Sequence, residues 1–444
     1  MAIQLLSIFS GRLALLRIVM LMSALALFGI GMAGIYSAGN PMTETVTDED
    51  ATAISGSDNT DIDTSTLNPD KTNQNAGAWK KQLVFAVAGL FAFLIVNLID
   101  YRRLGQASYW IYGVVLVLLM VILLDKWIDI PFVPYVKGSR RWIRLGMGNH
   151  YIQIQPSEFC KIAYIMALAW YLRFRSNYRH LVGLAGPFAL TVLAMALILL
   201  EPDLGTTMLL MPMLFSMLFV AGARVRHLLL FIGLAIVVSP ILWTMLHDYQ
   251  KMRISCVLLQ NERIFQAASE HPTLAKVLVG SPARLRDWKR NEGYHLMHSK
   301  QAIASGGLAG YGYGKGPYSQ YEYLPERHND FIFAMIAHQW GFWGGLVVML
   351  LYAILFACGA EIAYLNTDPF ARLTAVGIIA MFAVEVAVNV SMTLGLMPIT
   401  GLTLPFVSYG GSSLMVNMIA LGLLNNIGRF RPFSVAGKPF EHFQ

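Results

Sequence analysis

Ten apolar stretches, each long enough to cross the ~30 Å hydrocarbon core of a bilayer, dominate the chain. Loops separate them, so apolar and polar segments alternate along nearly the whole sequence. This pattern predicts an all-α polytopic membrane protein with about ten transmembrane helices, forming a single membrane domain over residues 1–444. The stretches cover residues 13–36, 81–99, 107–125, 157–174, 181–200, 205–222, 227–246, 331–357, 372–394 and 403–427.

The charged residues indicate how the helices are oriented. Only 13% of residues are charged, and many of the lysines and arginines behind the net charge of +7 lie in short loops. This placement argues against nucleic acid as a partner. The positive-inside rule places the short basic loops in the cytoplasm, so the remaining polar motifs are expected to face outward. The basic loops cover residues 101–103, 173–180, 223–227 and 428–432.

Two long polar segments interrupt the apolar pattern on the predicted outer side. Residues 40–77 are rich in Thr, Ser, Asp and Asn, which predicts a disordered acidic insert rather than a calcium site, because the carboxylates lack the spacing of a calcium loop. Residues 247–329 form a large outer loop. Its charged part, residues 259–290, is interpreted either as a surface helix or as a docking segment for a partner.

A lone aspartate, Asp330, stands directly before the apolar stretch that begins at residue 331. The Gly-rich polar sequence that begins at Gly293 leads up to it. The carboxylate is therefore expected in the first turn of a helix, at the boundary between water and lipid. Ionisable groups at membrane depth are costly unless they are used, so this position predicts a functional site.

Several other polar groups fall at the predicted outer ends of helices. Ser157 can cap a helix while Glu158 and Lys161 pair three residues apart, or these residues can meet a substrate together with nearby arginines. Asp203, in the turn EPDLG, can cap the next helix or bind a cation. The relevant arginines are Arg140, Arg141 and Arg144.

Glycine and proline break the helical pattern between Gly395 and Ser413. Irregular backbone at membrane depth must be buried in protein or line a polar cavity. The backbone amides of Gly410 and Gly411 can approach an anion there, or the glycines can serve close helix packing. Glu385, the deepest carboxylate, is interpreted as a protonated group inside the bundle or as part of the cavity.

The ordered set of polar motifs resembles the SEDS family of bacterial shape, elongation, division and sporulation proteins, from the first helix to Ile427. Within the family, Lys300 and Arg327 favour the elongation branch over the division branch. The motifs are RRWIRLG, IQPSEFCKIA, EPDLGTT, GYHLMHSKQAIASGGLAGYGYGKG, YLPERHNDFIFA and GLMPITGLTLPFVSYGGSS.

The resemblance implies a SEDS-type fold and a peptidoglycan glycosyltransferase of the bacterial cytoplasmic membrane. Such an enzyme polymerises lipid II into a glycan strand on the outer face, with a class B penicillin-binding protein and the elongation machinery as partners. The family's essential aspartate falls on Asp330. Further site residues implied by the match are Glu326, His328, Arg141, Lys161, Glu158, Asp203, Ser408 and Gly410.

The chemistry of glycan polymerisation assigns roles to some of these residues. Asp330 is predicted to be the general base for the incoming sugar hydroxyl, and direct displacement with a single base inverts the anomeric carbon. The departing pyrophosphate needs positive charge. That charge can come from a divalent cation, Mg²⁺ or Mn²⁺, held by Asp330 and Glu326, or from Arg140, Arg141, Lys161 or Arg253.

Two other functions remain open from the sequence, a lipid II flippase and a noncatalytic scaffold for the transpeptidase. The flippase is disfavoured because the polar motifs gather on one predicted face, whereas alternating access needs both. The chain also departs from the family pattern at His338 and Gln339, where relatives commonly carry an acidic pair. A catalytic role for that pair is therefore not expected here.

Overall fold

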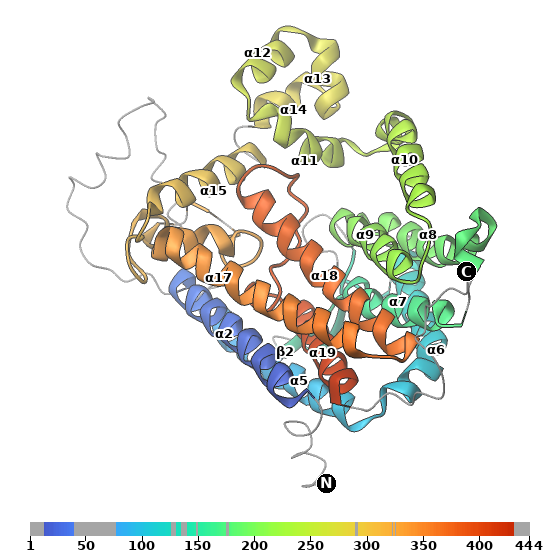
Figure 1. Ribbon diagram of the computed structural model, residues 1–444. Coiled ribbons are helices and arrows are strands. Elements are labelled where there is room, and N and C mark those ends of the chain that lie inside the picture. The colour runs from blue at the N-terminus through green and yellow to red at the C-terminus, as the bar shows by residue number, and fades with distance from the viewer. Residues whose placement is uncertain are drawn as a thin grey trace.

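The computed structural model describes residues 13–39, 77–125, 130–134, 140–147, 150–174, 177–288, 292–321, 323–324 and 326–429 (Figure 1). Apart from Gly77, the acidic insert predicted at residues 40–77 lies outside the described residues.

Each of the ten predicted stretches contains a long helix. Seven helical segments are long and apolar enough to cross a membrane, while α9 is a shorter apolar helix of 17 residues. The predicted polytopic membrane fold is therefore confirmed. The ten helices are α2 (Ala14–Gly39), α5 (Ala78–Leu98), α6 (Tyr101–Leu124), α7 (Pro156–Leu172), α8 (Ala185–Leu200), α9 (Leu204–Val220), α10 (Val225–Met245), α17 (Ile332–Leu365), α18 (Pro369–Thr393) and α19 (Gly411–Arg429).

Helix α18 lies at the centre of the bundle and α10 at its edge (Figure 1). Helix α18 contacts α7, α9, α17 and α19, and 67% of its most apolar 18-residue window is buried, against 6% for α10. Helix α10 therefore exposes apolar side chains on almost every side, which suits a helix surrounded by lipid. Buried polar side chains are concentrated in the central helices.

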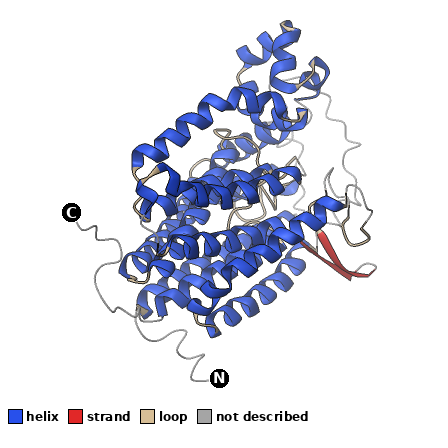
Figure 2. Ribbon diagram, turned by 90° about the vertical axis from the view of Figure 1, so that its right-hand side faces the viewer, coloured by secondary structure: helices blue, strands red, loops and turns tan. Residues whose placement is uncertain are grey.

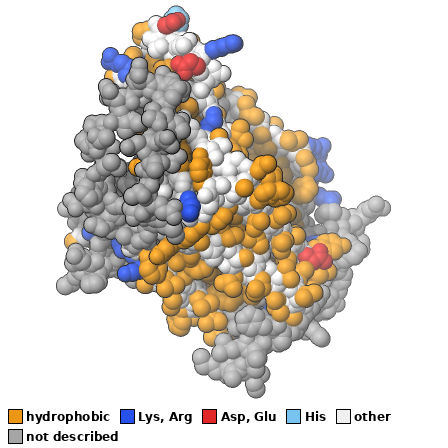
Figure 3. All heavy atoms as spheres, turned by 90° about the vertical axis from the view of Figure 1, so that its left-hand side faces the viewer, with side chains coloured by type: hydrophobic (Ala, Val, Ile, Leu, Met, Phe, Trp, Pro, Cys, Tyr) orange, Lys and Arg blue, Asp and Glu red, His pale blue; other side chains and the backbone are white. Residues whose placement is uncertain are grey.

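The outer surface of the bundle is apolar over a broad area. In Figure 3, hydrophobic side chains cover much of the visible face, and charged side chains lie mostly toward its edges. Large apolar side chains such as Leu25 on α2 and Trp343 on α17 are 61% and 60% exposed. Apolar exposure on this scale is unusual for a soluble monomer and is expected for a surface that faces lipid.

Six shorter helices between α10 and α17 form a separate outer unit. They are built around a second hydrophobic core that includes Met252, Leu285 and Trp288 and that reaches α17 through Phe331 and Met335. Helices α12 to α14 lie at the top of Figure 1, away from α19. The helices are α11 (Asp248–Leu259), α12 (Glu262–Glu270), α13 (Pro272–Val279), α14 (Pro282–Asp287), α15 (Glu292–Gly306) and α16 (Pro317–Gln320).

Two local features depart from a purely helical chain. Strands β1 (Ile143–Met147) and β2 (His150–Ile154) pair antiparallel, with Ile143 opposite Ile154, and they stand out in red at one side of Figure 2. The sequence signal for this hairpin is a Gly-Asn dipeptide between two segments of alternating character. Two short 3-10 helices, η2 (Asn177–Arg179) and η3 (Leu181–Leu184), connect α7 to α8.

Candidate functional site

Asp330 lies at the junction of the two hydrophobic cores. It ends the turn over residues 326–330 and is partly exposed, while Phe331 is buried in the outer core and Ile332 in the bundle core. Helix α17 begins at Ile332, with Phe331 at its N-cap position. Asp330 therefore precedes the first turn of the helix instead of lying within it, a difference from the sequence prediction.

The backbone of Asp330 is fixed by a buried amide. The Asn389 Nδ2 atom on α18 donates to the carbonyl oxygens of Asp330, at 2.9 Å, and of Leu402, at 2.7 Å. A Cβ atom added at Gly401 would lie 3.6 Å from the Asp330 Oδ2 atom. One asparagine thus joins the start of α17 to the irregular segment between α18 and α19. The Asp330 carboxylate lies close to the backbone at Gly401, where there is no side chain.

The turn before Asp330 brings three more predicted site residues together. The Glu326 carboxylate accepts a hydrogen bond from Asn329 at 2.7 Å, and Ser408 Oγ donates to the Asn329 carbonyl at 2.7 Å. The His328 carbonyl accepts from the Tyr409 amide at 2.9 Å, and the His328 and Tyr409 rings lie 5.7 Å apart. The structure therefore gathers Asp330, Glu326, His328 and Ser408 around one turn.

Gln82, which the sequence analysis did not single out, holds the segment that contains Ser408. Its Nε2 atom donates to the Ser408 carbonyl, and its Oε1 atom accepts from the Gly410 amide, both at 3.2 Å. The Gly410 amide is thus bonded to a protein acceptor, and its approach to an anion stays a prediction. A Cβ atom at Gly411 would overlap the Phe85 ring at 2.4 Å, which supports the packing interpretation of that glycine.

Asp203 is buried and fully engaged by protein donors. Its carboxylate accepts from Thr206 N at 3.2 Å, Thr206 Oγ1 at 2.9 Å, Ser157 Oγ at 2.9 Å and Gln155 Nε2 at 3.1 Å. The predicted cap of the following helix is therefore present on α9. A carboxylate with four donors is a poor candidate for direct substrate contact, so the substrate-binding role of Asp203 stays a prediction.

Lys161 lies between two carboxylates inside the bundle. Its Nζ atom is 2.7 Å from Glu158 Oε2 and 2.6 Å from Glu385 Oε1, and the lysine side chain is 1% exposed. This pairing confirms the predicted ion pair between Glu158 and Lys161, while contact of these two residues with substrate stays a prediction. It also shows that Glu385 meets a cation inside the bundle.

The predicted pyrophosphate arginines have different surroundings. The Arg140 guanidinium forms an ion pair with Asp125 at 2.5 Å, whereas Arg141 Nη2 donates to the Pro202 carbonyl at 2.6 Å. Arg253 on α11 is partly exposed and forms no ion pair within the described part of the chain. Arg141 and Arg253 are therefore better candidates for binding a phosphate than Arg140 or Lys161.

A divalent cation at this site would have few protein ligands. Within the described ranges, no group of three or more His, Cys, Asp or Glu side chains is arranged to hold a metal ion. Asp330 and Glu326 supply two carboxylates, and Mg²⁺ commonly binds one or two carboxylates together with substrate phosphates. The donor set thus suits an ion shared with a pyrophosphate, and the metal stays a prediction.

The Gly-rich sequence before Asp330 fits against a break in α17. The helix is interrupted at Gly341, where φ is 62° and ψ is −157°. The carbonyls of His338 and Gln339 accept from the amides of Tyr311 and Gly312, at 3.2 and 2.9 Å. Backbone groups freed by the break are thus satisfied by the loop, as membrane depth requires.

His338 and Gln339 hold the segments that meet at this break. His338 is fully buried, and its Nδ1 atom lies 2.9 Å from Ser305 Oγ. Gln339 is 1% exposed and donates from Nε2 to Ser37 and Ser319. Both side chains hold neighbouring segments around the break.

Aromatic and histidine side chains pack the outer unit over the turn that contains Asp330. The His295 ring stacks on the Phe331 ring, with the ring centroids 6.2 Å apart. The centroid of the His298 ring lies 4.0 Å from that of Tyr294 and 6.1 Å from that of Tyr323. Burial, with a smaller contribution from His295, lowers the pKa of His298 below its ordinary value. Burial also raises the pKa of Tyr323. The histidine therefore favours its neutral form within this cluster.

Comparisons with known proteins identify relatives along most of the chain. The model of a family described as cell cycle proteins, covering FtsW, RodA and SpoVE, matches residues 63–432. The chain is 35% identical to the peptidoglycan glycosyltransferase RodA of Treponema pallidum, over 78% of this chain and 88% of that protein. It is 32% identical to a probable peptidoglycan glycosyltransferase, FtsW of Trichlorobacter lovleyi, over 94% of both chains.

Solved structures share the fold. A chain from a peptidoglycan synthase complex, studied for its coordination of polymerization and crosslinking, matches with a TM-score of 0.65 and 26% identity, over 92% of this chain and 96% of that chain. The rod shape determining protein RodA of Thermus thermophilus matches with a TM-score of 0.57 and 25% identity, over 92% and 95% of the two chains. Both similarities extend beyond the bundle to nearly the whole chain.

Proposed function

Because the chain belongs to the FtsW/RodA/SpoVE family, known as SEDS, we propose that it is a peptidoglycan glycosyltransferase that polymerises lipid II, with Asp330 as the general base. Relatives that are 32–35% identical carry the name peptidoglycan glycosyltransferase. The elongation branch remains part of the proposal, supported by the motifs around Lys300 and Arg327.

The observation that carries the proposal is the position of Asp330. Its backbone is fixed by Asn389, it is partly exposed, and it lies where the membrane bundle meets the outer unit. A lipid-linked sugar has its chain in the membrane and its sugars in water. A base at this junction can therefore reach the sugar hydroxyl while the lipid chain stays in the bilayer.

In the proposed reaction, a sugar hydroxyl attacks the anomeric carbon of the lipid-linked donor. The Asp330 carboxylate takes the hydroxyl proton as the new carbon–oxygen bond forms. The bond from the anomeric carbon to the pyrophosphate oxygen breaks, and its electron pair leaves with the pyrophosphate. One displacement inverts the anomeric carbon, so trapping of a covalent glycosyl-enzyme would contradict this mechanism.

Charge on the departing pyrophosphate needs stabilisation by fixed positive groups. Arg141 and Arg253 are the proposed candidates because neither forms an ion pair within the described ranges. A divalent cation held by Asp330 and Glu326 would supply Lewis-acid neutralisation of the leaving group. The side chain of Glu326 is oriented for this by its hydrogen bond from Asn329.

The proposed orientation places Asp330 outside the cytoplasmic membrane. Helix ends that carry basic residues, including Arg102, Arg179 and Arg226, alternate along the chain with the helix ends that surround Asp330. The positive-inside rule assigns the basic end to the cytoplasm. A class B penicillin-binding protein is the proposed outer partner, supported by the match to a chain of a peptidoglycan synthase complex.

The test is polymerisation of labelled lipid II by the purified chain, alone and with its cognate transpeptidase. Asp330→Asn should lower the rate by about 10²–10⁴-fold, the range for loss of a general base, while the protein still elutes as a folded species. Equal strand formation by both proteins would place the base elsewhere. Absence of strands in every sample, with the partner and divalent cations present, would favour a flippase or a scaffold.

A further inference from the structure

A groove of about 440 Å³ lies between α6, α7 and α8, at the opposite end of α7 from the Asp330 site. Its volume lies within the range of about 300–1,000 Å³ that is usual for ligand sites. Tyr109 and Leu193 at its edges are 44% and 50% exposed, so the groove opens on the lipid-facing side of the bundle. Its lining residues are Tyr109, Tyr171, Gly186, Ala189, Leu190 and Leu193.

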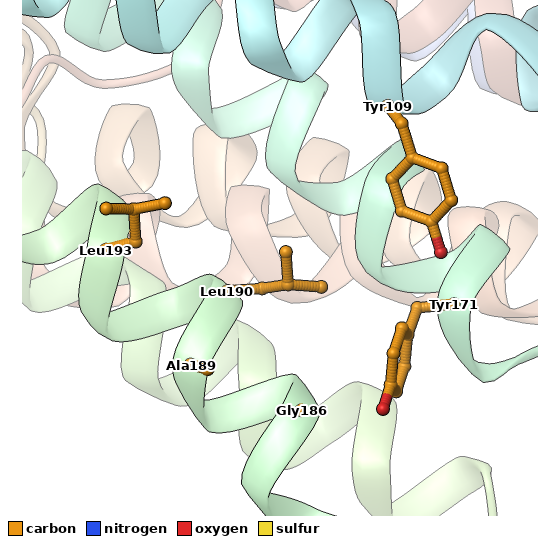
Figure 4. A pocket seen from close by; sticks show the side chains of 6 residues that line it. All are labelled: Tyr109, Tyr171, Gly186, Ala189, Leu190 and Leu193. Atoms are coloured by element: carbon orange, nitrogen blue, oxygen red, sulfur yellow. The ribbon is translucent and has the colours of Figure 1, made fainter.

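The groove is polar at one end and apolar at the other. Figure 4 shows the two tyrosine rings at one end and Leu193 at the other, with Leu190 between them. Gly186 and Leu193 are seven residues apart on α8, which corresponds to about 10 Å along the helix. A Cβ atom at Gly186 would lie 2.0 Å from the Tyr171 Oη atom, so the glycine leaves room for that hydroxyl.

Positive charge borders the polar end. Arg173 is the C-cap residue of α7, two residues after Tyr171. Its guanidinium lies over the rings of Trp170 and Phe174, 3.0 and 4.4 Å from their centroids. Arg102 and Arg103 lie in the first turn of α6, on the same end of the bundle. The groove thus combines a basic rim, two hydroxyl groups and an apolar floor.

We propose that this groove binds one anionic phospholipid, with its phosphate at Arg173 and the tyrosine hydroxyls and one acyl chain along Leu190 and Leu193. Basic pockets between transmembrane helices on the cytoplasmic side suit anionic lipid head groups. The apolar floor lies at bilayer depth, where acyl chains are the abundant ligand. This binding is independent of the glycosyltransferase activity.

Native mass spectrometry of the full chain in detergent tests the proposal, with phosphatidylglycerol and phosphatidylcholine of the same acyl composition as probes. The unmodified chain should retain one phosphatidylglycerol at concentrations where phosphatidylcholine does not bind. Arg173→Gln should weaken phosphatidylglycerol binding about five-fold, equivalent to about 1 kcal/mol. The matched control Arg226→Gln removes an exposed arginine from the same end of the bundle, on α10. This control should leave phosphatidylglycerol binding unchanged.

A second variant tests the apolar part of the groove. Ala189 is exposed on α8 and lines the groove, so Ala189→Phe should fill it and abolish lipid retention. Val237→Phe, at a 73% exposed position on α10, is the control and should retain the lipid. Equal binding of both lipids, retention by Ala189→Phe, or absence of any retained lipid would overturn the proposal, the last favouring a protein helix as the occupant.

Discussion

Two acidic regions at the same end of the bundle differ in how deeply their carboxylates are buried. At the starts of α7 and α9, Asp203 accepts four hydrogen bonds and Lys161 joins two buried carboxylates. At the start of α17, Asp330 is partly exposed, and Asn389 donates a hydrogen bond to its backbone carbonyl.

This difference separates acids that hold the fold from an acid that can react. Asp203 and Asp330 both stand directly before an apolar helix in the sequence, so position alone does not distinguish them. Asp203 is buried, whereas Asp330 is partly exposed and can be reached by a substrate. Substitutions in the first region should therefore affect stability most, and those at Asp330 should affect catalysis.

The largest effect on stability is expected from Lys161→Met. Removing the ammonium leaves Glu158 and Glu385 close together in the bundle without their cation. Breaking a buried ion pair in this way costs about 3–5 kcal/mol of stability. The measurement is the unfolding midpoint of the purified protein in mixed SDS and neutral detergent.

The double variant Lys161→Met, Glu385→Gln is the control for that experiment. It removes one of the two negative charges, so it should recover part of the lost stability, because a neutral buried group is less costly than an unpaired charge. If the single variant were as stable as the unmodified chain, the ion network would not hold α7 to α18. The comparison between the two acidic regions would then fail.

A smaller loss is expected from Asp203→Asn. The amide retains one acceptor oxygen but places an NH₂ group against donors from Ser157, Thr206 or Gln155. Leaving buried donors unsatisfied costs about 1–3 kcal/mol. The unfolding midpoint should fall accordingly, while activity per folded molecule changes little. Loss of activity with an unchanged unfolding midpoint would instead favour a substrate-binding role for Asp203.

Much of the fold follows from the sequence because lipid imposes a strict rule on the backbone. Every span must be helical and long enough to cross, so ten apolar stretches yield ten helices. The bounds of α7 were predicted to within two residues, whereas α17 continues eight residues past the predicted end at 357 and α19 begins eight residues after the predicted start at 403. The apolar residues just before α19 are irregular in backbone, so hydropathy alone places the start too early. The break at Gly341 was missed because its backbone partners come from a loop some thirty residues earlier.

The candidate site was only partly predictable, since sequence motifs identify residue types but not their partners. Asp330, Glu326 and His328 are near neighbours in the chain, so their proximity follows directly. The roles of Gln82 and Asn389 depend on contacts across the bundle. Amide side chains within largely apolar helices are the signal that could have identified both, because such groups need partners at membrane depth.

A pH-dependent effect is expected in the outer unit that covers Asp330. Burial lowers the pKa of His298 below its ordinary 6.5. As the pH falls below about 6.5, the unfolded chain takes up a proton at this position that the folded chain resists, so stability should decrease. His298→Gln should reduce that decrease, measured as the unfolding midpoint between pH 7.5 and pH 5. An identical pH profile in both proteins would show that the histidine is not held neutral by the fold.

The smallest change in stability is expected from Asp330→Asn, the substitution with the greatest expected effect on catalysis. The side chain is partly exposed and nearly isosteric with asparagine, and Asn389 bonds to the backbone carbonyl, which the substitution keeps. The free energy of unfolding, obtained from the unfolding midpoint, should therefore change by less than about 0.5 kcal/mol, as for substitutions outside the core. A loss as large as that of Asp203→Asn would mean that both acids hold the fold, and the loss of strand synthesis could then no longer be assigned to a missing base.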